Sequence, residues 1–229
     1  MIRALIFDCD GVLVDTERDG HRVAFNATFA KLGLNVEWSV AEYGELLKIA
    51  GGKERMRAYF DRRGWPAGDP KALIQKLHET KTELFMQIIN DGRLPLRPGV
   101  ARIVDEAIAD GLMLAVCSTS NEKAVTRVVE RMLGPDRRKY FNAILAGDIV
   151  AKKKPDPEIY VLAKKTLNLA GNEGVVVEDS RNGLLAAKGA GFKCLVTKSS
   201  YTQDEDFSEA DRVVDELGDR VMVRELMAL

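Results

Sequence analysis

The segment LIFDCDGVLVDTE, residues 5–17, begins with an apolar run and then places Asp8 and Asp10 on either side of Cys9. Residues two apart on an extended strand point to the same side, so we expect the two carboxylates to lie together at the end of a buried strand. Carboxylates held in this way repel one another, and burial adds a desolvation cost. The pair therefore indicates a site that offsets this cost, unless the segment is only an acidic loop.

The composition is typical of a globular enzyme. The 229 residues are 46% hydrophobic and 30% charged, with a formal net charge of -1, which gives no electrostatic footprint for nucleic acid or an anionic membrane. No apolar run approaches the roughly 20 residues that span a bilayer. Cys9, Cys117 and Cys194 lie in apolar runs and are expected to be reduced core residues of an intracellular protein. Because the chain begins directly on a strand, we expect no signal or transit peptide in it. The expected location is the cytoplasm in a bacterium, or the chloroplast stroma if the chain is from a photosynthetic eukaryote.

The spacing of apolar residues changes along the chain. From residue 20 to about residue 90 it is helical, as in Ala24, Phe25, Thr28 and Phe29, and after residue 99 helices alternate with short apolar runs. These runs, together with 4–7, predict at least five strands of a parallel sheet covered on both faces, at 112–116, 143–147, 174–177 and 193–196. We therefore expect an α/β fold in which a doubly wound, Rossmann-like core, residues 1–16 and 94–229, carries an inserted helical cap domain, residues 17–93, at the carboxyl edge of its sheet.

Hydroxyl side chains follow the predicted strand at 112–116. The stretch STSN covers residues 118–121, and Thr119 with Glu122 has the spacing of a capping box at a helix start. Hydroxyls beside the free N–H groups of a helix start suit an anion such as phosphate. A simple helix cap would explain Thr119 equally well, but it does not require Ser118.

Two more acids follow the predicted strand at 174–177. Glu178 and Asp179 bring the number of carboxylates at this edge to four, together with Asp8 and Asp10. Four such groups require a cation, and hard oxygen ligands beside a phosphate suit Mg²⁺. A helix N-terminus that favours negative charge would explain one of these acids and not four. The sequence therefore predicts a Mg²⁺ site formed by all four carboxylates.

A lysine run lies between these strand ends, in the stretch KKKPDP of residues 152–157. Pro155 favours an extended conformation for Lys154, and Asp156 with Pro157 is typical of an N-cap and the first residue of a helix. Lys154 is therefore expected to hold its charge against the phosphate and the aspartates. The other two lysines fit a solvated loop.

Together the strand ends predict phosphoryl transfer. Asp8 would attack phosphorus to form an aspartyl-phosphate, and Asp10 would protonate the leaving alkoxide and later take a proton from water. Mg²⁺ would neutralise charge, while Ser118 and Lys154 hold the phosphoryl oxygens. Metal and substrate would then offset the cost of the aspartate pair.

Four motifs, DCDGVLVDTE, VCSTSN, KKKPDP and VVVEDS, occur in the order found in the haloacid dehalogenase-like phosphohydrolases, which the whole chain resembles. Within that group LVDTERDGHR, AEYGELL, GGKER, HETKTELF and LRPG are similar to the CbbY-type phosphatases. The resemblance implies hydrolysis of xylulose-1,5-bisphosphate, an inhibitor of Rubisco in the Calvin cycle, with Mg²⁺ as the cofactor. No partner other than this small molecule is expected: no nucleic acid, no membrane and no second subunit.

The stretch GGKER, residues 51–55, bears on the substrate. It places Lys53 and Arg55 in the first turn of a helix, where cations oppose the helix dipole unless an anion lies between them, and a second phosphate would supply that anion. A plain loop with an exposed helix face is the alternative. The resemblance implies a substrate site lined by Glu17, His21, Tyr43, Gly51, Gly52, Lys53, Arg55, Lys81, Arg97, Thr119, Ser120 and Asn121.

Other functions stay open. A phosphosugar mutase of the same fold would need the same nucleophile and a distal-phosphate site, and differs in returning the phosphoryl group to the sugar. A phosphatase for another small phosphomonoester, such as phosphoglycolate, is a further alternative. A non-enzymatic phospho-accepting receiver fits less well, because receivers place the acceptor aspartate on a later strand and lack an inserted cap.

Overall fold

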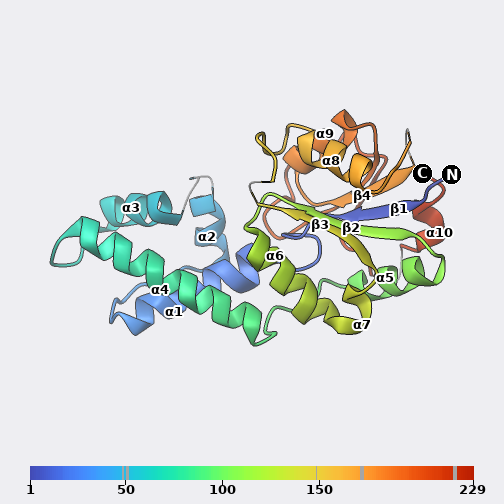
Figure 1. The fold of residues 1–229 in the computed structure, drawn as a ribbon. Coiled ribbons are helices and arrows are strands. Elements are labelled where there is room, and N and C mark those ends of the chain that lie inside the picture. The colour runs from blue at the N-terminus through green and yellow to red at the C-terminus, as the bar shows by residue number, and fades with distance from the viewer. Residues whose placement is uncertain (48, 50–51, 148, 171–172, 219–220) are drawn as a thin grey trace. The chain divides into compact units, whose positions relative to one another are not determined.

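The computed structural model describes residues 1–47, 49, 52–147, 149–170, 173–218 and 221–229. Its contacts divide the chain into two compact units (Figure 1). The sheet unit comprises Met1–Asp15 and Leu94–Leu229, and the helical unit is Thr16–Arg93. The roles of catalytic core and cap for these two units stay predictions.

The sheet unit contains a six-stranded sheet in the order β3-β2-β1-β4-β5-β6, in which every neighbouring pair is parallel. Its strands are β1 Ala4–Phe7, β2 Met113–Ser118, β3 Phe141–Ala146, β4 Gly174–Glu178, β5 Lys193–Thr197 and β6 Arg212–Val214. The five predicted strands are confirmed, and β6 is additional. Because all strands run the same way, their carboxyl ends lie along one edge of the sheet.

Helices cover both faces of this sheet, which confirms the predicted doubly wound fold (Figure 1). The helical segments of the unit are α5 Val100–Ala109, α6 Glu122–Val128, η2 Val129–Leu133, α7 Gly134–Arg138, α8 Glu158–Thr166, α9 Arg181–Gly189 and α10 Val223–Leu226. α8 and α9 lie on one face, where Ile159 and Leu184 pack with Ile6 and Val176 in a continuous apolar core. α5, α6 and α7 lie on the other face.

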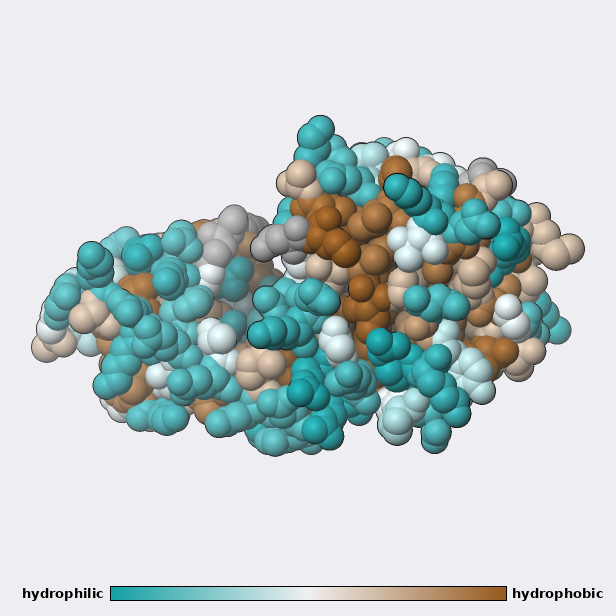
Figure 2. Space-filling model, viewed as in Figure 1, coloured by the Kyte–Doolittle hydropathy of each residue, from teal (hydrophilic) through white to brown (hydrophobic). Residues whose placement is uncertain are grey.

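The helical unit is built around aromatic side chains. Its segments are η1 Thr16–His21, α1 Arg22–Lys31, α2 Val40–Leu47, α3 Gly52–Arg63 and α4 Pro70–Asn90. Phe25, Phe29, Trp38, Tyr43 and Phe60 are all buried and contact one another ring to ring. The surface of this unit is largely hydrophilic in Figure 2, as expected for helices that bury one apolar face. Among the described residues, no helix combines the length and apolar character that crossing a bilayer demands.

Two predicted helix starts are wrong. α6 begins at Glu122, and its cap is Asn121, whose Oδ1 accepts from the backbone N–H groups of Lys123 and Ala124, instead of the predicted Thr119. Asparagine and threonine are both good caps, so sequence spacing alone could not choose between them. α8 begins at Glu158, one residue after the predicted start at Pro157, although Asp156 Oδ1 still accepts from the backbone N–H of Glu158.

Candidate active site

Three polar side chains lie side by side where β1, β2 and β4 end. Phe7 pairs with Val116 on one side and with Val177 on the other. Asp8, directly after β1, is therefore level with the end of β4 and within one residue of the end of β2. Ser118 ends β2 and Glu178 ends β4, and both are buried, as is Asp8. Parallel register therefore brings these predicted residues together at one edge.

Lys154 joins these strand ends. Its Nζ donates to Asp8 Oδ1 at 2.6 Å, to Glu178 Oε1 at 2.5 Å and to the carbonyl oxygen of Cys117 at 2.9 Å. Burial lowers the pKa of the Lys154 ammonium, but the attraction of Asp8 and Glu178 outweighs burial and the pKa is raised overall. The lysine therefore stays charged beside Asp8.

Negative charge at this edge exceeds what Lys154 balances. Burial raises the pKa of Asp8 well above its usual range in spite of Lys154, and the charges of Glu178, Asp10 and Asp179 raise it further. Burial and then the charge of Glu178 raise the pKa of Asp179 to about 8. Both carboxyl groups would regain their ordinary acidity beside a cation.

A divalent cation fits three of these carboxylates. Asp8, Glu178 and Asp179 each offer an oxygen, and within the described part of the chain these oxygens lie within 4.8 Å of one another. Hard oxygen donors in a buried, negatively charged site suit Mg²⁺. Glu178 already accepts from Lys154 and from the Tyr160 hydroxyl, both at 2.5 Å from Oε1, so Asp8 and Asp179 are the better candidates for direct ligands.

Asp10 has a different environment from the other acids. Its Oδ2 accepts from the Ser120 hydroxyl at 2.5 Å and from the Ser118 hydroxyl at 3.3 Å. The Ser120 backbone N–H in turn donates to Ser118 Oγ at 3.1 Å. The two serines, predicted as phosphate ligands, therefore orient Asp10 in this structure.

Sequence reasoning missed two glycines that make room for the acids. A Cβ on Gly11 would lie 2.0 Å from Asp179 Oδ2, and Gly11 also has a φ of +82°, in the left-handed region. A Cβ on Gly183 would lie 2.0 Å from the Glu178 carboxylate. Tyr160 was missed as well, because its contact with Glu178 depends on how α8 packs on the sheet and leaves no local signal. Gly11 does have a recognisable sequence signal, since a glycine directly after the aspartate pair allows another side chain to approach the backbone closely.

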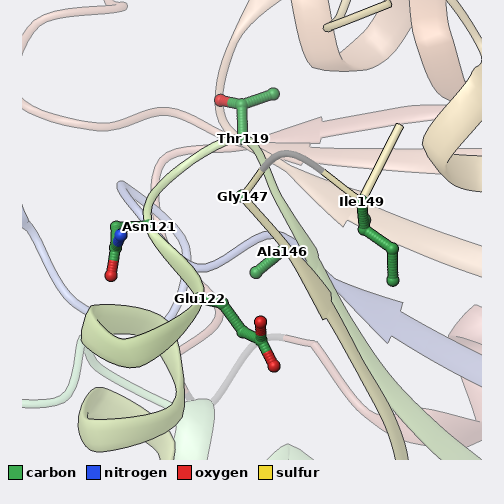
Figure 3. Close-up of a pocket in the computed structure, with 6 residues that line it drawn as sticks. All are labelled: Thr119, Asn121, Glu122, Ala146, Gly147 and Ile149. Carbon is green, nitrogen blue, oxygen red and sulfur yellow. The ribbon is translucent and has the colours of Figure 1, made fainter. Parts of the chain in front are cut away.

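The remaining predicted phosphate ligands, Thr119 and Asn121, line a cavity of about 560 Å³ (Figure 3). Glu122 completes its β2–α6 side, and residues 146, 147 and 149 at the end of β3 form the other side. The Asn121 side chain is occupied as the α6 cap.

In the helical unit, Glu17, Tyr43 and Arg55 form a hydrogen-bonded chain. The Tyr43 hydroxyl donates to Glu17 Oε2 at 2.6 Å and accepts from Arg55 Nη1 at 2.9 Å. Arg55 Nε also donates to the carbonyl oxygen of Leu46 at 3.1 Å. Arg55 is buried, so the exposed helix face considered as an alternative does not describe it.

His21 and Lys81 form a second pair in the same unit. Lys81 Nζ lies 2.9 Å from His21 Nδ1 and above the rings of Phe25 and Phe85. Burial, then the charges of Lys81 and Arg55, lower the pKa of His21 well below its usual value, so the ring is neutral and Nδ1 accepts from Lys81. Burial also lowers the pKa of Lys81, to about 8, although Glu17 opposes this.

The other predicted substrate residues are placed as follows. Gly52 begins α3, where a Cβ would lie 3.3 Å from the Phe25 ring, and Lys53 next to it is half-buried. Gly51 lies outside the described residues. Arg97 belongs to the sheet unit, where its guanidinium donates to backbone carbonyls.

Comparison with known proteins gives a consistent picture. The model of the haloacid dehalogenase-like hydrolase family matches residues 2–191. A CBBY-like protein of Arabidopsis thaliana is 60% identical over 94% of this chain and 69% of its own length. The crystal structure of CbbY from Rhodobacter sphaeroides with phosphate is 43% identical, has a TM-score of 0.79 and covers 100% of both chains. A mutant of that protein in complex with xylulose-1,5-bisphosphate is 43% identical, has a TM-score of 0.78 and covers 99% of both chains.

Proposed function

Because this chain belongs to the haloacid dehalogenase-like hydrolases and is an enzyme that acts on phosphate esters, we propose that it is a Mg²⁺-dependent phosphatase for a sugar bisphosphate, namely xylulose-1,5-bisphosphate. The observation that carries this proposal is the buried contact of Lys154 with Asp8, beside Ser118, at the carboxyl edge of the sheet. The bisphosphate bound to the similar protein supports the choice of substrate. Removal of a Rubisco inhibitor follows from the resemblance, and both this role and the predicted location stay predictions.

Asp8 is the nucleophile in this proposal. One of its oxygens attacks phosphorus, the bond to the sugar oxygen breaks, and an aspartyl-phosphate forms that water then hydrolyses. Lys154 holds Asp8 Oδ1 and sets a positive charge next to the oxygens of the incoming phosphoryl group. Glu178 and Tyr160 keep Lys154 in this position through the shared contact at Glu178 Oε1.

Asp10 is the general acid and base. It donates a proton to the leaving sugar oxygen and takes one from the water that attacks the aspartyl-phosphate. The hydroxyls of Ser118 and Ser120 hold its carboxyl group in one orientation. This arrangement lets one side chain serve both steps.

The cation would be held by Asp8 and Asp179, with Glu178 beside them. Bound Mg²⁺ supplies charge neutralisation, which lets an anionic carboxylate approach an anionic phosphate. The substrate's sugar and distal phosphate would be bound by residues of the helical unit: Glu17, His21, Tyr43, Lys53, Arg55 and Lys81.

A phosphate-release assay over a panel of sugar mono- and bisphosphates, with phosphoglycolate included, tests the proposal. We expect xylulose-1,5-bisphosphate to have the highest kcat/KM, by about tenfold or more over either monophosphate of the same sugar, because a charged hydrogen bond to the distal phosphate contributes roughly 1.5–3 kcal/mol. A higher value for phosphoglycolate would contradict the substrate. Return of the phosphoryl group to the sugar without phosphate release would identify a mutase.

A further inference from the structure

Arg97 joins three separate segments of the sheet unit through their backbone carbonyls. Its Nη1 donates to the carbonyl oxygens of Gly11 and, at 3.2 Å, of Thr197. Its Nη2 donates to the carbonyl oxygens of Lys198, at 2.5 Å, and Asp215, at 3.2 Å. The planar fork of a guanidinium can bridge several acceptors at once, which the point charge of a lysine cannot.

Two of these segments enclose the Asp179 carboxylate. The Cα of Gly11 faces it so closely that a Cβ would lie 2.0 Å from Asp179 Oδ2. On the other segment, Ser199 follows Lys198 in the chain, and its side chain lies close enough to Asp179 to lower the pKa of that carboxyl group. Arg97 therefore binds the carbonyl of Gly11 itself and, on the other segment, the carbonyl of Lys198, the residue before Ser199.

The backbone of Arg97 is tied to the same loop. Its N–H donates to the carbonyl oxygen of Leu13 at 2.9 Å, and the preceding residue, Leu96, forms an antiparallel bridge with Val14. The turn that follows β1 contains Asp10 and Gly11. Both the main chain and the side chain of Arg97 hold this turn by hydrogen bonds.

From this geometry we propose that Arg97 is a positioning residue for the cation site: it fixes the turn at Asp10 and Gly11 and the loop at Ser199 around Asp179. This assignment rests on the proposed function, since it concerns the cation that the phosphatase would use. It differs from the role implied by resemblance, in which Arg97 binds the substrate. In this assignment the guanidinium acts through the backbone carbonyls that it binds.

The test compares Arg97→Met and Arg97→Lys with Arg102→Met. Arg102 is a matched control, because its guanidinium also donates to backbone carbonyls of the sheet unit, those of Leu217, Gly218 and Val221, but on segments that carry no acid of the site. Binding of Mn²⁺ is measured by the electron paramagnetic resonance signal of the free ion, and folding by circular dichroism and urea denaturation. Release of phosphate is measured on the bisphosphate and on a monophosphate of the same sugar.

We expect both Arg97 variants to weaken Mn²⁺ binding by about 10-fold or more, as is usual when a residue supporting a ligand is lost, and Arg102→Met to stay within about twofold of wild type. The loss of kcat/KM should be similar on the two substrates. Arg97→Lys keeps the charge but cannot bridge the loops, so it should resemble Arg97→Met. If Arg97→Met does not fold, Arg97→Lys alone decides the question.

Three outcomes would overturn the assignment. Unchanged Mn²⁺ binding in a folded Arg97 variant would show that the loops hold Asp179 without it. A loss confined to the bisphosphate and restored by lysine would identify Arg97 as a phosphate ligand. Wild-type protein that binds no Mn²⁺ would overturn the proposed function together with this inference, whereas the first two results leave the proposed function standing.

Discussion

Lys154 is the residue on which the geometry of the site depends, because its ammonium group contacts Asp8, Glu178 and the carbonyl of Cys117 at once. An ammonium group has three N–H donors, and these three contacts use them all. Its position is therefore fixed by three strand ends. A change at any one of these strand ends would therefore move Lys154 and alter its contact with Asp8.

Asp8→Asn removes the nucleophile's charge and keeps its shape. Since Glu178 still holds Lys154, the variant should fold, and phosphate release should fall by about 10² or more, as expected for a lost catalytic group. The exposed Asp204→Asn is the control and should retain wild-type rates. Phosphate release by Asp8→Asn within about tenfold of wild type would rule out the covalent route.

Asp179 makes stability depend on pH in protein stripped of divalent cations. Its pKa is raised to about 8 by burial and Glu178, so the folded state keeps a proton that the unfolded state, with an ordinary value of about 3.9, has released. The stability due to this proton is fully present below about pH 4 and is lost as pH rises through about 8. Urea denaturation in chelator should therefore show a falling free energy of unfolding from about pH 5 to about pH 8.

Two variants and one addition isolate this effect. Asp179→Asn should show a smaller fall over the same pH range, and Asp204→Asn should show the wild-type fall. Added Mg²⁺ should restore stability at the upper end, because it binds the folded state. A fall of the same size in Asp179→Asn would assign the pH dependence to other groups, of which Asp8 is the foremost.

At the residue scale, the sequence predicted the polar residues at the strand ends, but it did not predict the residues of the helices that pack against them. Asp8, Ser118 and Glu178 could be found because each follows an apolar run, and parallel strands end at one edge. Tyr160 and Gly183 could not, because their contacts with Glu178 arise from the packing of α8 and α9. Thr119 was misassigned because capping residues compete locally.

At the element scale, α9 shows how a helix is adapted to the site. Gly183 lies in its first turn, where alanine would ordinarily stabilise the helix by roughly 1 kcal/mol. Here the added Cβ would lie 2.0 Å from the Glu178 carboxylate, which holds Lys154. Local helix preference and the geometry of the site therefore oppose one another at this position.

We expect Gly183→Ala to lower the free energy of unfolding by about 1–3 kcal/mol, the usual cost of overpacking. It should also lower kcat, because displacing Glu178 moves Lys154. Gly189→Ala in the same helix is the control: its Cβ would lie 3.3 Å from the Pro157 side chain, far from Glu178, so kcat should stay unchanged. A stabilised Gly183→Ala with full activity would show that Glu178 moves freely.

Elements were predicted where their apolar pattern is strong. The five buried strands were found, whereas β6 was missed because it has three residues and none of them is buried. Such an edge strand forms only because β5 offers a hydrogen-bonding partner, through Val196 and Val213 among others. Local sequence holds no information about that partner.

At the scale of the whole molecule, the proposed function assigns chemistry and substrate choice to different units. The sheet unit carries Asp8 and Lys154, and the helical unit carries the predicted sugar-binding residues, among them Lys53 and Arg55. The structure gives these two cations different surroundings. Arg55 is buried and hydrogen-bonded to Tyr43 and to the carbonyl of Leu46, so Arg55→Ala would remove two buried hydrogen bonds and lower stability as well as activity.

Lys53→Ala is therefore the sharper test of the distal-phosphate site. Lys53 is half-buried at the start of α3, so its truncation should leave the unit folded. If its ammonium grips a second phosphate, the loss of roughly 1.5–3 kcal/mol should lower kcat/KM for the bisphosphate by about 10–150-fold. A monophosphate of the same sugar has no second phosphate for Lys53 to bind, so its kcat/KM should change by no more than about threefold.

Lys76 on α4 is exposed, so Lys76→Ala is the control for charge alone, and it should leave kcat/KM for both substrates unchanged. Part of the loss in Lys53→Ala should appear in kcat as well as in KM, because binding energy from a remote group is used to orient the reacting phosphoryl. Equal losses on the two substrates would mean that Lys53 does not recognise a second phosphate. The bisphosphate would then rest on similarity to CbbY alone.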